Sequence, residues 1–389
     1  MSPKLTSRLF STNRKKLLNL LGEGAPVVLV AHGLMQRSND SEYRFEQDRN
    51  FYYLSGLDEP DWILVIDGDE QYLIEPERSE IEKIFNGSAQ LDKISKITGI
   101  NTVVESKDGW KKLREFDEVR TIVPRPQKFG TASLNPSKKL FLDKLGTKTT
   151  DITAQLLHLR TIKSLPEINA IRHAIKLTGE GFSNAISSIN HLTTEAELEA
   201  VFTHLFTVKQ LRHGYTPIVA GGENACTLHY IANNQKLPKN GLVLIDIGAQ
   251  YNYYSADITR TISIGKVSSR QDEVQQAVKM AFDRIIKIIK PGLGLEEYQE
   301  QTNEIMNDAI SGLGLGDSSD TREKYFPHAP SHGLGLDVHD ALVGYNAFQP
   351  GMVLTLEPGI YIPNEAIGVR YEDDLLITDD GVENLSQDI

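Results

Sequence analysis

The second half of the chain carries acidic residues inside or at the ends of apolar, strand-like runs, where charged side chains are normally absent. Four acids share this setting: Asp246 within the run 242–247, Asp257 before the run 258–264, Glu357 after the run 352–356, and Glu372 before the run 374–378. A single acid of this kind ordinarily caps a strand or lies in a turn. Several buried carboxylates that approach one another stay ionised only if positive charge compensates them. The sequence therefore favours a fold in which these strand ends meet around cations.

Two histidines, His332 and His339, flank the segment 333–336 in the same half of the chain. Four carboxylates and one neutral imidazole balance the charge of two divalent cations and leave room for a bridging hydroxide. Hard oxygen ligands with one histidine suit Mn²⁺ best, with Co²⁺ and Zn²⁺ as alternatives. Two such metals generate a nucleophile from water at neutral pH and polarise a carbonyl group. The pattern therefore indicates metal-assisted hydrolysis.

Helix-start signals alternate with these apolar runs. Capping-box patterns open three predicted helices: Ser164–Glu167, Thr194–Glu197, and Ser269–Asp272, the last helix ending at Pro291–Gly292. Several of the runs are separated by turns too short for a crossover helix, which favours antiparallel pairing. This half is expected to be a layered α+β domain.

The first half is expected to be a smaller mixed α/β domain. Its strand candidates are 25–31, 62–66 and 121–123, the last stopped by Pro124, with helical segments between them. At 389 residues the chain is too long for one ordinary core. The helix start at Ser164 places the boundary near residue 160, which gives domains 1–160 and 161–389.

Composition excludes several classes of partner. The net charge of −12 argues against nucleic acid binding, which needs a basic face. No apolar stretch approaches the length of a membrane span, and the basic segment 4–21 reads as an amphipathic helix rather than a targeting signal. The one cysteine, Cys226, forms no internal disulfide and gives no indication of an oxidising compartment. The sequence predicts a soluble, cytoplasmic protein with no membrane or nucleic acid partner.

The acidic and histidine segments resemble those of the pita-bread metallopeptidases, in the same order. The matching segments are Leu244–Ala249 and Ser255–Thr261 for the aspartates, Ser331–His339 for the histidine, and Leu354–Gly359 and Gly368–Asp374 for the glutamates. Segment 224–230 resembles the stretch that supplies a substrate-facing histidine, and segments 37–43 and 45–54 resemble the accessory domain of the proline-specific branch. Within that branch the sequence is most similar to Xaa-Pro aminopeptidases (aminopeptidase P), then to Xaa-Pro dipeptidases (prolidases).

This resemblance implies a pita-bread (creatinase/aminopeptidase) fold and two metal ions. Asp246 is implied as a terminal ligand of one metal, and His332 and Glu357 as terminal ligands of the other. Asp257 and Glu372 are implied as ligands that bridge the two metals. Every ligand type of the family is present.

The resemblance also implies residues that contact substrate. His229 and His339 are implied as histidines that face the scissile peptide without binding metal, and Glu357 as the group that passes a proton to the departing proline nitrogen. Arg370, two residues before Glu372 on a strand, is expected to hold a ligand or substrate carboxylate. His328 matches a family histidine, with a structural role as the alternative. Asp337 is expected to support its loop.

The implied activity is hydrolysis of the N-terminal Xaa-Pro bond by a metal-bridging hydroxide, on peptides with proline in the second position. The nearest alternative is a prolidase restricted to dipeptides. A methionine-type aminopeptidase is disfavoured by the accessory domain. A metal-free binding module or creatinase-like enzyme is disfavoured by the complete ligand set, as is a purely structural protein. The resemblance further implies a homodimer or homotetramer.

Overall fold

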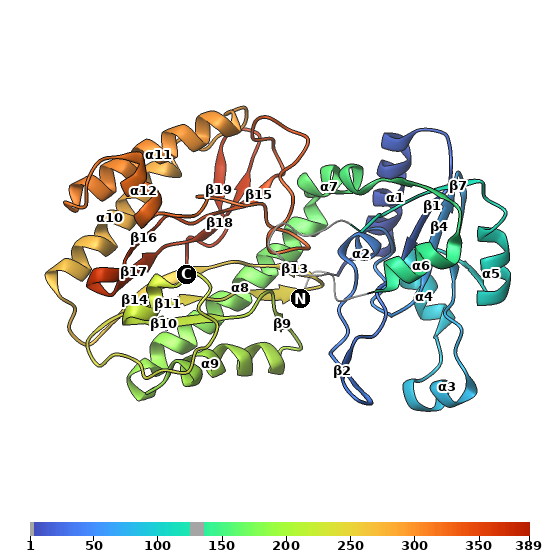
Figure 1. The fold of residues 1–389 in the computed structure, drawn as a ribbon, viewed down its shortest axis with the longest axis horizontal. Helices are drawn as coiled ribbons and strands as arrows, with labels where there is room; N and C mark the ends of the chain where they lie inside the picture. The colour runs from blue at the N-terminus through green and yellow to red at the C-terminus, as the bar shows by residue number, and fades with distance from the viewer. Residues whose placement is uncertain (1–3, 125–135) are drawn as a thin grey trace. The chain divides into compact units, whose positions relative to one another are not determined.

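Helices and strands alternate through both halves of the chain in the computed structural model, which describes residues 4–124 and 136–389. Contacts between residues divide the chain into two units, 5–159 and 160–389. Figure 1 shows the helices and strands of each unit.

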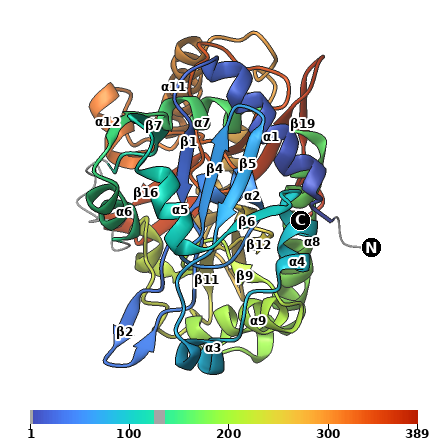
Figure 2. The same cartoon turned by 90° about the vertical axis from the view of Figure 1, so that its right-hand side faces the viewer.

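The unit 5–159 is built on a six-stranded sheet with the order β6-β5-β4-β1-β7-β8. Figure 2 shows β1, β4 and β5 side by side in this sheet. The strands are β1 Val27–Val30, β4 Ile63–Asp67, β5 Glu70–Ile74, β6 Thr102–Val104, β7 Glu118–Thr121 and β8 Lys148–Asp151, with a separate hairpin of β2 Gln36–Ser38 and β3 Ser41–Glu42. The helices are α1 Ser7–Leu21, α2 Arg49–Ser55, α3 Glu80–Asn86, α4 Leu91–Thr98, α5 Ser106–Leu113, α6 Ser137–Leu145 and α7 Thr153–Thr161.

The sheet mixes antiparallel and parallel pairs, as a mixed α/β unit requires. Strand β4 pairs antiparallel with β1 and β5, whereas β6, β7 and β8 join in parallel. The strands predicted at 25–31 and 62–66 are present, but the one predicted at 121–123 is wrong in position. Strand β7 ends at Thr121 because its partner β8 ends opposite, at Asp151. Beyond that point the amide of Val123 donates to the Asp151 side chain, and the pairing ends.

The predicted amphipathic helix near the N-terminus is confirmed as α1. It buries Leu9, Phe10 and Leu17 on one face, together with Arg14. The Arg14 guanidinium is satisfied by the carbonyl oxygens of Leu54 and Thr98, so the charge is buried with partners. Within 4–124 and 136–389, no helix combines the length and the apolar character that crossing a bilayer demands.

The unit 160–389 places short antiparallel sheets between two pairs of helices, α8 with α9 and α10 with α11 (Figure 1). The helices are α8 Leu165–Ser188, α9 Glu195–Val208, α10 Ser269–Ile285, α11 Leu295–Gly312 and α12 Ser319–Tyr325, and short 3₁₀ turns are η1 Ile189–His191, η2 Gly222–Cys226 and η3 Pro363–Glu365. One three-stranded sheet contains β10 Ile218–Gly221, β11 Gly241–Asp246 and β14 Thr259–Ile264, and a second contains β9 Arg212–His213, β12 Ala249–Tyr251 and β13 Tyr254–Ser255. A third contains β15 Val353–Leu356, β18 Asp373–Ile377 and β19 Val382–Asn384. Strands β16 Gly359–Ile362 and β17 Ile367–Arg370 form a two-stranded sheet. The predicted antiparallel pairing is confirmed.

Two of the three predicted helix starts are confirmed, and one is wrong by a residue. Capping boxes at Ser164 and Thr194 open α8 and α9. The N-cap of α10 is Ser268 rather than Ser269, because its hydroxyl accepts from the Gln271 amide. Helix α10 also ends at Ile285 and does not run to Pro291.

Strand register brings the acidic segments to one place. Asp246 is the last residue of β11 and lies opposite Thr259, near the start of β14. Leu356, the last residue of β15, lies opposite Asp373 of β18. The amide of Glu372 donates to the Thr259 carbonyl oxygen at 3.1 Å, which ties the two sheets together at these ends.

Candidate metal centre and active site

The five predicted metal ligands converge on one site. Their ligand atoms form overlapping groups whose members lie within 4.8 Å of one another: Asp246 with Asp257 and Glu372, His332 with Glu357 and Glu372, and Asp257 with His332 and His339. Asp257, Glu372 and His332 each belong to two of these groups. The site therefore offers several adjacent sets of oxygen and nitrogen donors.

The carboxylates of this site carry more negative charge than their surroundings compensate. Burial raises the pKa of Asp246 to about 6, although Arg370 opposes the shift. Burial, with Asp257 and Asp246 adding to it, raises the pKa of Glu357 to about 7. Burial and the charge of Asp257 raise the pKa of Glu372 well above its usual range. Bound cations would remove this cost, so the donor set fits divalent metals.

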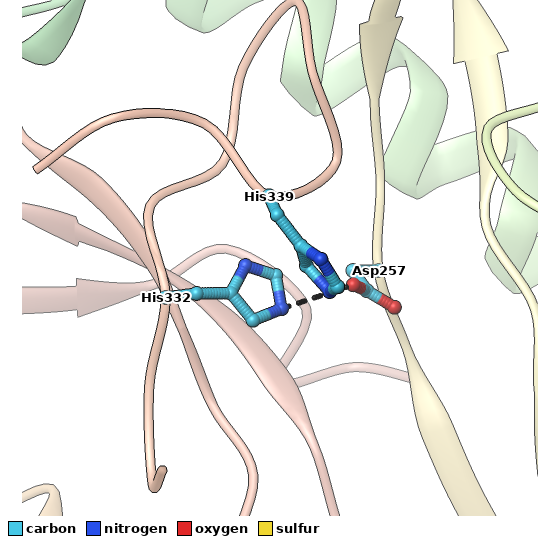
Figure 3. A group of neighbouring side chains, drawn as sticks. All are labelled: Asp257, His332 and His339. Carbon is cyan, nitrogen blue, oxygen red and sulfur yellow. Dashed lines mark ion pairs between the residues drawn. The ribbon is translucent and has the colours of Figure 1, made fainter. Parts of the chain in front are cut away.

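His332 directs one ring nitrogen toward the carboxylates. Its Nε2 lies 3.4 Å from Asp257 Oδ2 and 3.5 Å from Glu357 Oε1, and Figure 3 marks the first of these pairs. Its Nδ1 faces the Gly333 carbonyl oxygen at 3.0 Å, so Nδ1 carries a proton and Nε2 can serve as a ligand. Burial lowers the pKa of His332, but Asp257 and Glu357 outweigh it and raise the pKa to about 9.

His339 stands beside His332 at the same edge of the site. The two rings meet edge to face with centroids 4.3 Å apart, and Figure 3 shows His339 next to Asp257. Burial, together with the charge of His332, lowers the pKa of His339. A neutral imidazole that is partly open to solvent can donate a hydrogen bond to substrate.

His229 is exposed in the turn that follows η2. It is close enough to His328 and His339 for its charge to lower the pKa of both. The structure thus brings this upstream histidine to the same region as the histidines of the segment 328–339.

Protein groups occupy both ring nitrogens of His328. Nε2 lies 2.9 Å from the Tyr361 hydroxyl, and Nδ1 lies 2.9 Å from the Ala329 carbonyl oxygen. Glu357 Oε2 is 3.6 Å from Nδ1. Burial lowers the pKa of His328 to about 4, and Arg370 adds to the shift, so the ring is neutral.

Arg370 lies among the carboxylates at the end of β17. It donates to Asp246 through Nη2 and to the Tyr361 hydroxyl through Nη1 at 3.0 Å. Its Nε is 3.9 Å from Glu372 Oε2. Of the two predicted partners for this side chain, a ligand carboxylate and a substrate carboxylate, the structure shows contact with Asp246, which is a predicted ligand.

Three further residues that were not predicted as site residues hydrogen-bond to residues of this site. Tyr215 donates to Asp246 Oδ1 at 2.5 Å, and Thr259 donates to Glu372 Oε2 at 2.6 Å. Asp374 accepts from the Asp257 amide at 3.1 Å. Thr259 is the first residue of β14 and follows Asp257 by two residues, a spacing that is visible in the sequence.

The buried side chain of Arg160 holds the histidine segment 332–340 through two of its aspartates. A bridge between Gly333 and Asp340 closes the segment. Arg160 Nη2 donates to Asp337 Oδ2 at 2.5 Å and to Asp340 Oδ1 at 2.8 Å, and Lys163 Nζ lies 3.6 Å from Asp340 Oδ2. Asp337 therefore contacts Arg160 and takes part in none of the donor groups.

Known proteins resemble the chain over both halves. A model of metallopeptidase family M24 matches residues 169–379, and a model of the aminopeptidase P N-terminal domain matches residues 10–122. The chain is 30% identical to Xaa-Pro aminopeptidase 3 of Rattus norvegicus, over 100% of this chain and 85% of that protein. It is 30% identical to the Xaa-Pro aminopeptidase of Escherichia coli, over 99% and 96%. The expected fold, a catalytic pita-bread domain with a smaller N-terminal domain, is confirmed.

A solved structure supports the same likeness. Aminopeptidase P from E. coli with the inhibitor Pro-Leu matches with a TM-score of 0.87 at 29% identity. The match covers 99% of this chain and 95% of that one. The likeness thus extends over both units.

Proposed function

The chain belongs to metallopeptidase family M24, and we propose that it is an Xaa-Pro aminopeptidase, which hydrolyses the bond between the first residue of a peptide and a following proline. The observation that carries the proposal is the convergence of Asp246, Asp257, His332, Glu357 and Glu372 in one buried site. The N-terminal match to aminopeptidase P favours this activity over a prolidase.

We propose that two divalent metal ions occupy this site. Asp246 would hold one, His332 and Glu357 the other, and Asp257 and Glu372 would lie between them. Such cations, when bound, lower the pKa of water and polarise a carbonyl group. The donor set is four carboxylates and one imidazole, which suits Mn²⁺ better than Co²⁺ or Zn²⁺.

The side chains around the carboxylates supply proton transfer and hydrogen bonding. Glu357, whose Oε1 lies 3.5 Å from His332 Nε2, is the group that we propose accepts a proton and returns it to the departing proline nitrogen. We propose that the imidazoles of His229 and His339 donate hydrogen bonds to the scissile carbonyl oxygen as charge develops there. Arg370 holds the Asp246 carboxylate in place. We also propose that His328, whose ring is held by the Tyr361 hydroxyl, contributes to substrate binding.

Selectivity for proline has a physical basis in the substrate. The Xaa-Pro amide is tertiary and has no N–H, so a site that requires a hydrogen bond from that nitrogen rejects it. A site that packs the pyrrolidine ring accepts it.

Hydrolysis of matched peptides tests the activity. An Xaa-Pro-Yaa peptide should release its first residue, whereas the Xaa-Ala-Yaa peptide and the N-acetylated Xaa-Pro-Yaa peptide should be cleaved far more slowly. Equal cleavage of the proline and alanine peptides would contradict proline selectivity, and cleavage of the acetylated peptide would contradict an aminopeptidase.

Metal affinity is expected to rise with pH between about 5.5 and 9. The metal-free protein holds protons on Asp246, Glu357 and His332, whose pKa values are raised to about 6, about 7 and about 9, and metal binding must displace them. Calorimetric titration with Mn²⁺ in buffers of different ionisation enthalpy measures this release. Affinity that stays constant over this range, with no protons released, would contradict the assignment.

We propose the setting of the enzyme on the same basis. The net charge of −12 and the lone Cys226 suit a cytoplasmic protein that binds peptides rather than nucleic acid. We propose that each chain consists of an accessory domain, 1–160, and a catalytic domain, 161–389. We further propose that the chains form a homodimer or homotetramer.

A further inference from the structure

Glu195 is a buried carboxylate that lies outside the metal site and holds the segment that carries His229. It is the first residue of α9, and its relative exposure is 0%. Within the described parts of the chain no basic side chain forms an ion pair with it. A buried carboxylate without a cation must be satisfied by several hydrogen-bond donors. The segment from which those donors come is therefore the part of the chain that Glu195 anchors.

All four donors come from the segment 221–235. Oε1 accepts from the Gly221 amide at 2.9 Å and from Asn224 Nδ2 at 3.0 Å. Oε2 accepts from the Tyr230 hydroxyl at 2.8 Å and from the Gln235 amide at 3.0 Å. One oxygen thus holds the start of the segment and the other holds its end, and His229 lies between them, next to Tyr230.

Backbone contacts close the base of this segment. The Glu195 amide donates to the Gln235 carbonyl oxygen at 2.9 Å, and the Leu237 amide donates to the Thr193 carbonyl oxygen at 2.9 Å. Thr194 and Lys236 form an antiparallel bridge. The carboxylate therefore sits where the two ends of the segment come together.

The far side of the segment rests on β17, the strand that ends at Arg370. Cys226 Sγ donates to the Ile367 carbonyl oxygen at 3.3 Å. A Cβ atom at Gly368 would lie 2.2 Å from the Ala225 carbonyl oxygen, so only glycine permits this approach. The segment is thus fixed between Glu195 and a strand of the active site.

We propose that Glu195 is a positioning residue that fixes the segment 221–235 and thereby holds His229 at the edge of the active site. The inference rests on the proposed function, because it gives His229 a role toward the substrate. His229 is exposed in a turn and directly precedes Tyr230, whose hydroxyl donates to Glu195. Small displacements of a positioned group cost about 10²-fold in rate.

Glu195→Gln tests the proposal, because the amide keeps the shape of the side chain but replaces one acceptor oxygen with a donor. Glu197→Gln is the matched control on the same helix. The Glu197 carboxylate accepts only from Thr193 and Thr194, outside the segment. Hydrogen exchange over residues 221–235 and kcat/KM are measured with metal content matched to the parent.

Glu195→Gln is expected to speed amide exchange in this segment about tenfold or more and to lower kcat/KM about 10- to 100-fold. Glu197→Gln should change both by less than about twofold. Tyr230→Phe removes one donor and should give a smaller effect in the same direction, which keeps the test valid if Glu195→Gln folds poorly. In a His229→Ala background, Glu195→Gln should lower kcat/KM by less than about twofold further.

Unchanged exchange and unchanged kcat/KM in Glu195→Gln would overturn the proposal. If Glu195→Gln lowers kcat/KM in the His229→Ala background as much as it does in the parent chain, the proposal is also overturned, because Glu195 would then act through another group. If the parent chain hydrolyses no Xaa-Pro peptide, the proposed function is overturned, and the exchange comparison alone decides the anchoring role.

Discussion

Replacement of Glu372 with alanine is expected to abolish metal pairing and to lower kcat/KM by at least about 10³-fold. Glu372 is 2% exposed, and its carboxylate belongs both to the donor group of His332 and Glu357 and to that of Asp246 and Asp257. In the proposed two-metal site its loss would therefore remove a ligand from both metals at once. Metal content per chain, measured after chelation and reloading with Mn²⁺, should fall from two ions to one or none.

Asp337→Asn is the matched control for this prediction. Asp337 lies in the histidine segment, but its half-exposed side chain contacts Arg160 and takes part in none of the donor groups. This variant should keep both metals and most of its activity. Unchanged turnover in Glu372→Ala, or an equal loss of metal in Asp337→Asn, would contradict the ligand assignment. Asp257→Ala should behave like Glu372→Ala.

Replacement of Arg160 with methionine is expected to destabilise the catalytic unit by about 3–5 kcal/mol. The Arg160 and Asp340 side chains are each 2% exposed, and removal of the guanidinium takes the shorter ionic contact from the buried Asp340 carboxylate, which keeps Lys163 at 3.6 Å and the Ala341 amide at 2.8 Å. An uncompensated buried charge carries a large penalty, whereas an exposed one is solvated. Urea unfolding, followed by a probe in the unit 160–389, measures the loss.

Arg172→Met provides the comparison, because Arg172 makes a two-bond pair with Glu383 at 2.7 and 2.6 Å. That pair is 39% and 43% exposed, so the same substitution should cost less than about 1 kcal/mol. Equal losses in the two variants would show that the buried pair contributes no more than a surface pair.

The parts of the fold that could be predicted are those encoded by neighbouring residues. The capping boxes at Ser164 and Thr194 each lie within four residues, so the sequence shows both partners. The start of α10 was ambiguous because Ser268 and Ser269 are adjacent, and each has a suitable residue three positions later. Packing of the helix decides between them, and a single sequence does not display it.

Long-range pairing explains what the sequence left out. Tyr215 lies 31 residues before Asp246, and Arg370 lies 124 residues after it, yet both hold its carboxylate. A tyrosine carries no pattern that indicates such a partner. The order of the N-terminal sheet, with β1 between β4 and β7, depends on pairing between distant strands in the same way.

The acidic residues were predictable as a group because their setting was unusual. Each interrupts or ends an apolar run, and burial of several carboxylates requires compensating cations. The convergence of Asp246, Asp257 and Glu372 follows that reasoning. Their individual ligand roles depend on bound metals, so these remain predictions.

One measurement tests the central claim most directly: metals are stripped from the purified protein, Mn²⁺ is restored, and hydrolysis of an Xaa-Pro dipeptide is compared with that of an Xaa-Pro-Yaa tripeptide. We expect the stripped protein to be inactive and the restored protein to release the first residue of the tripeptide preferentially. Cleavage of the dipeptide alone would identify a prolidase. Inertness toward both peptides, with metal bound in the site, would contradict the proposed function.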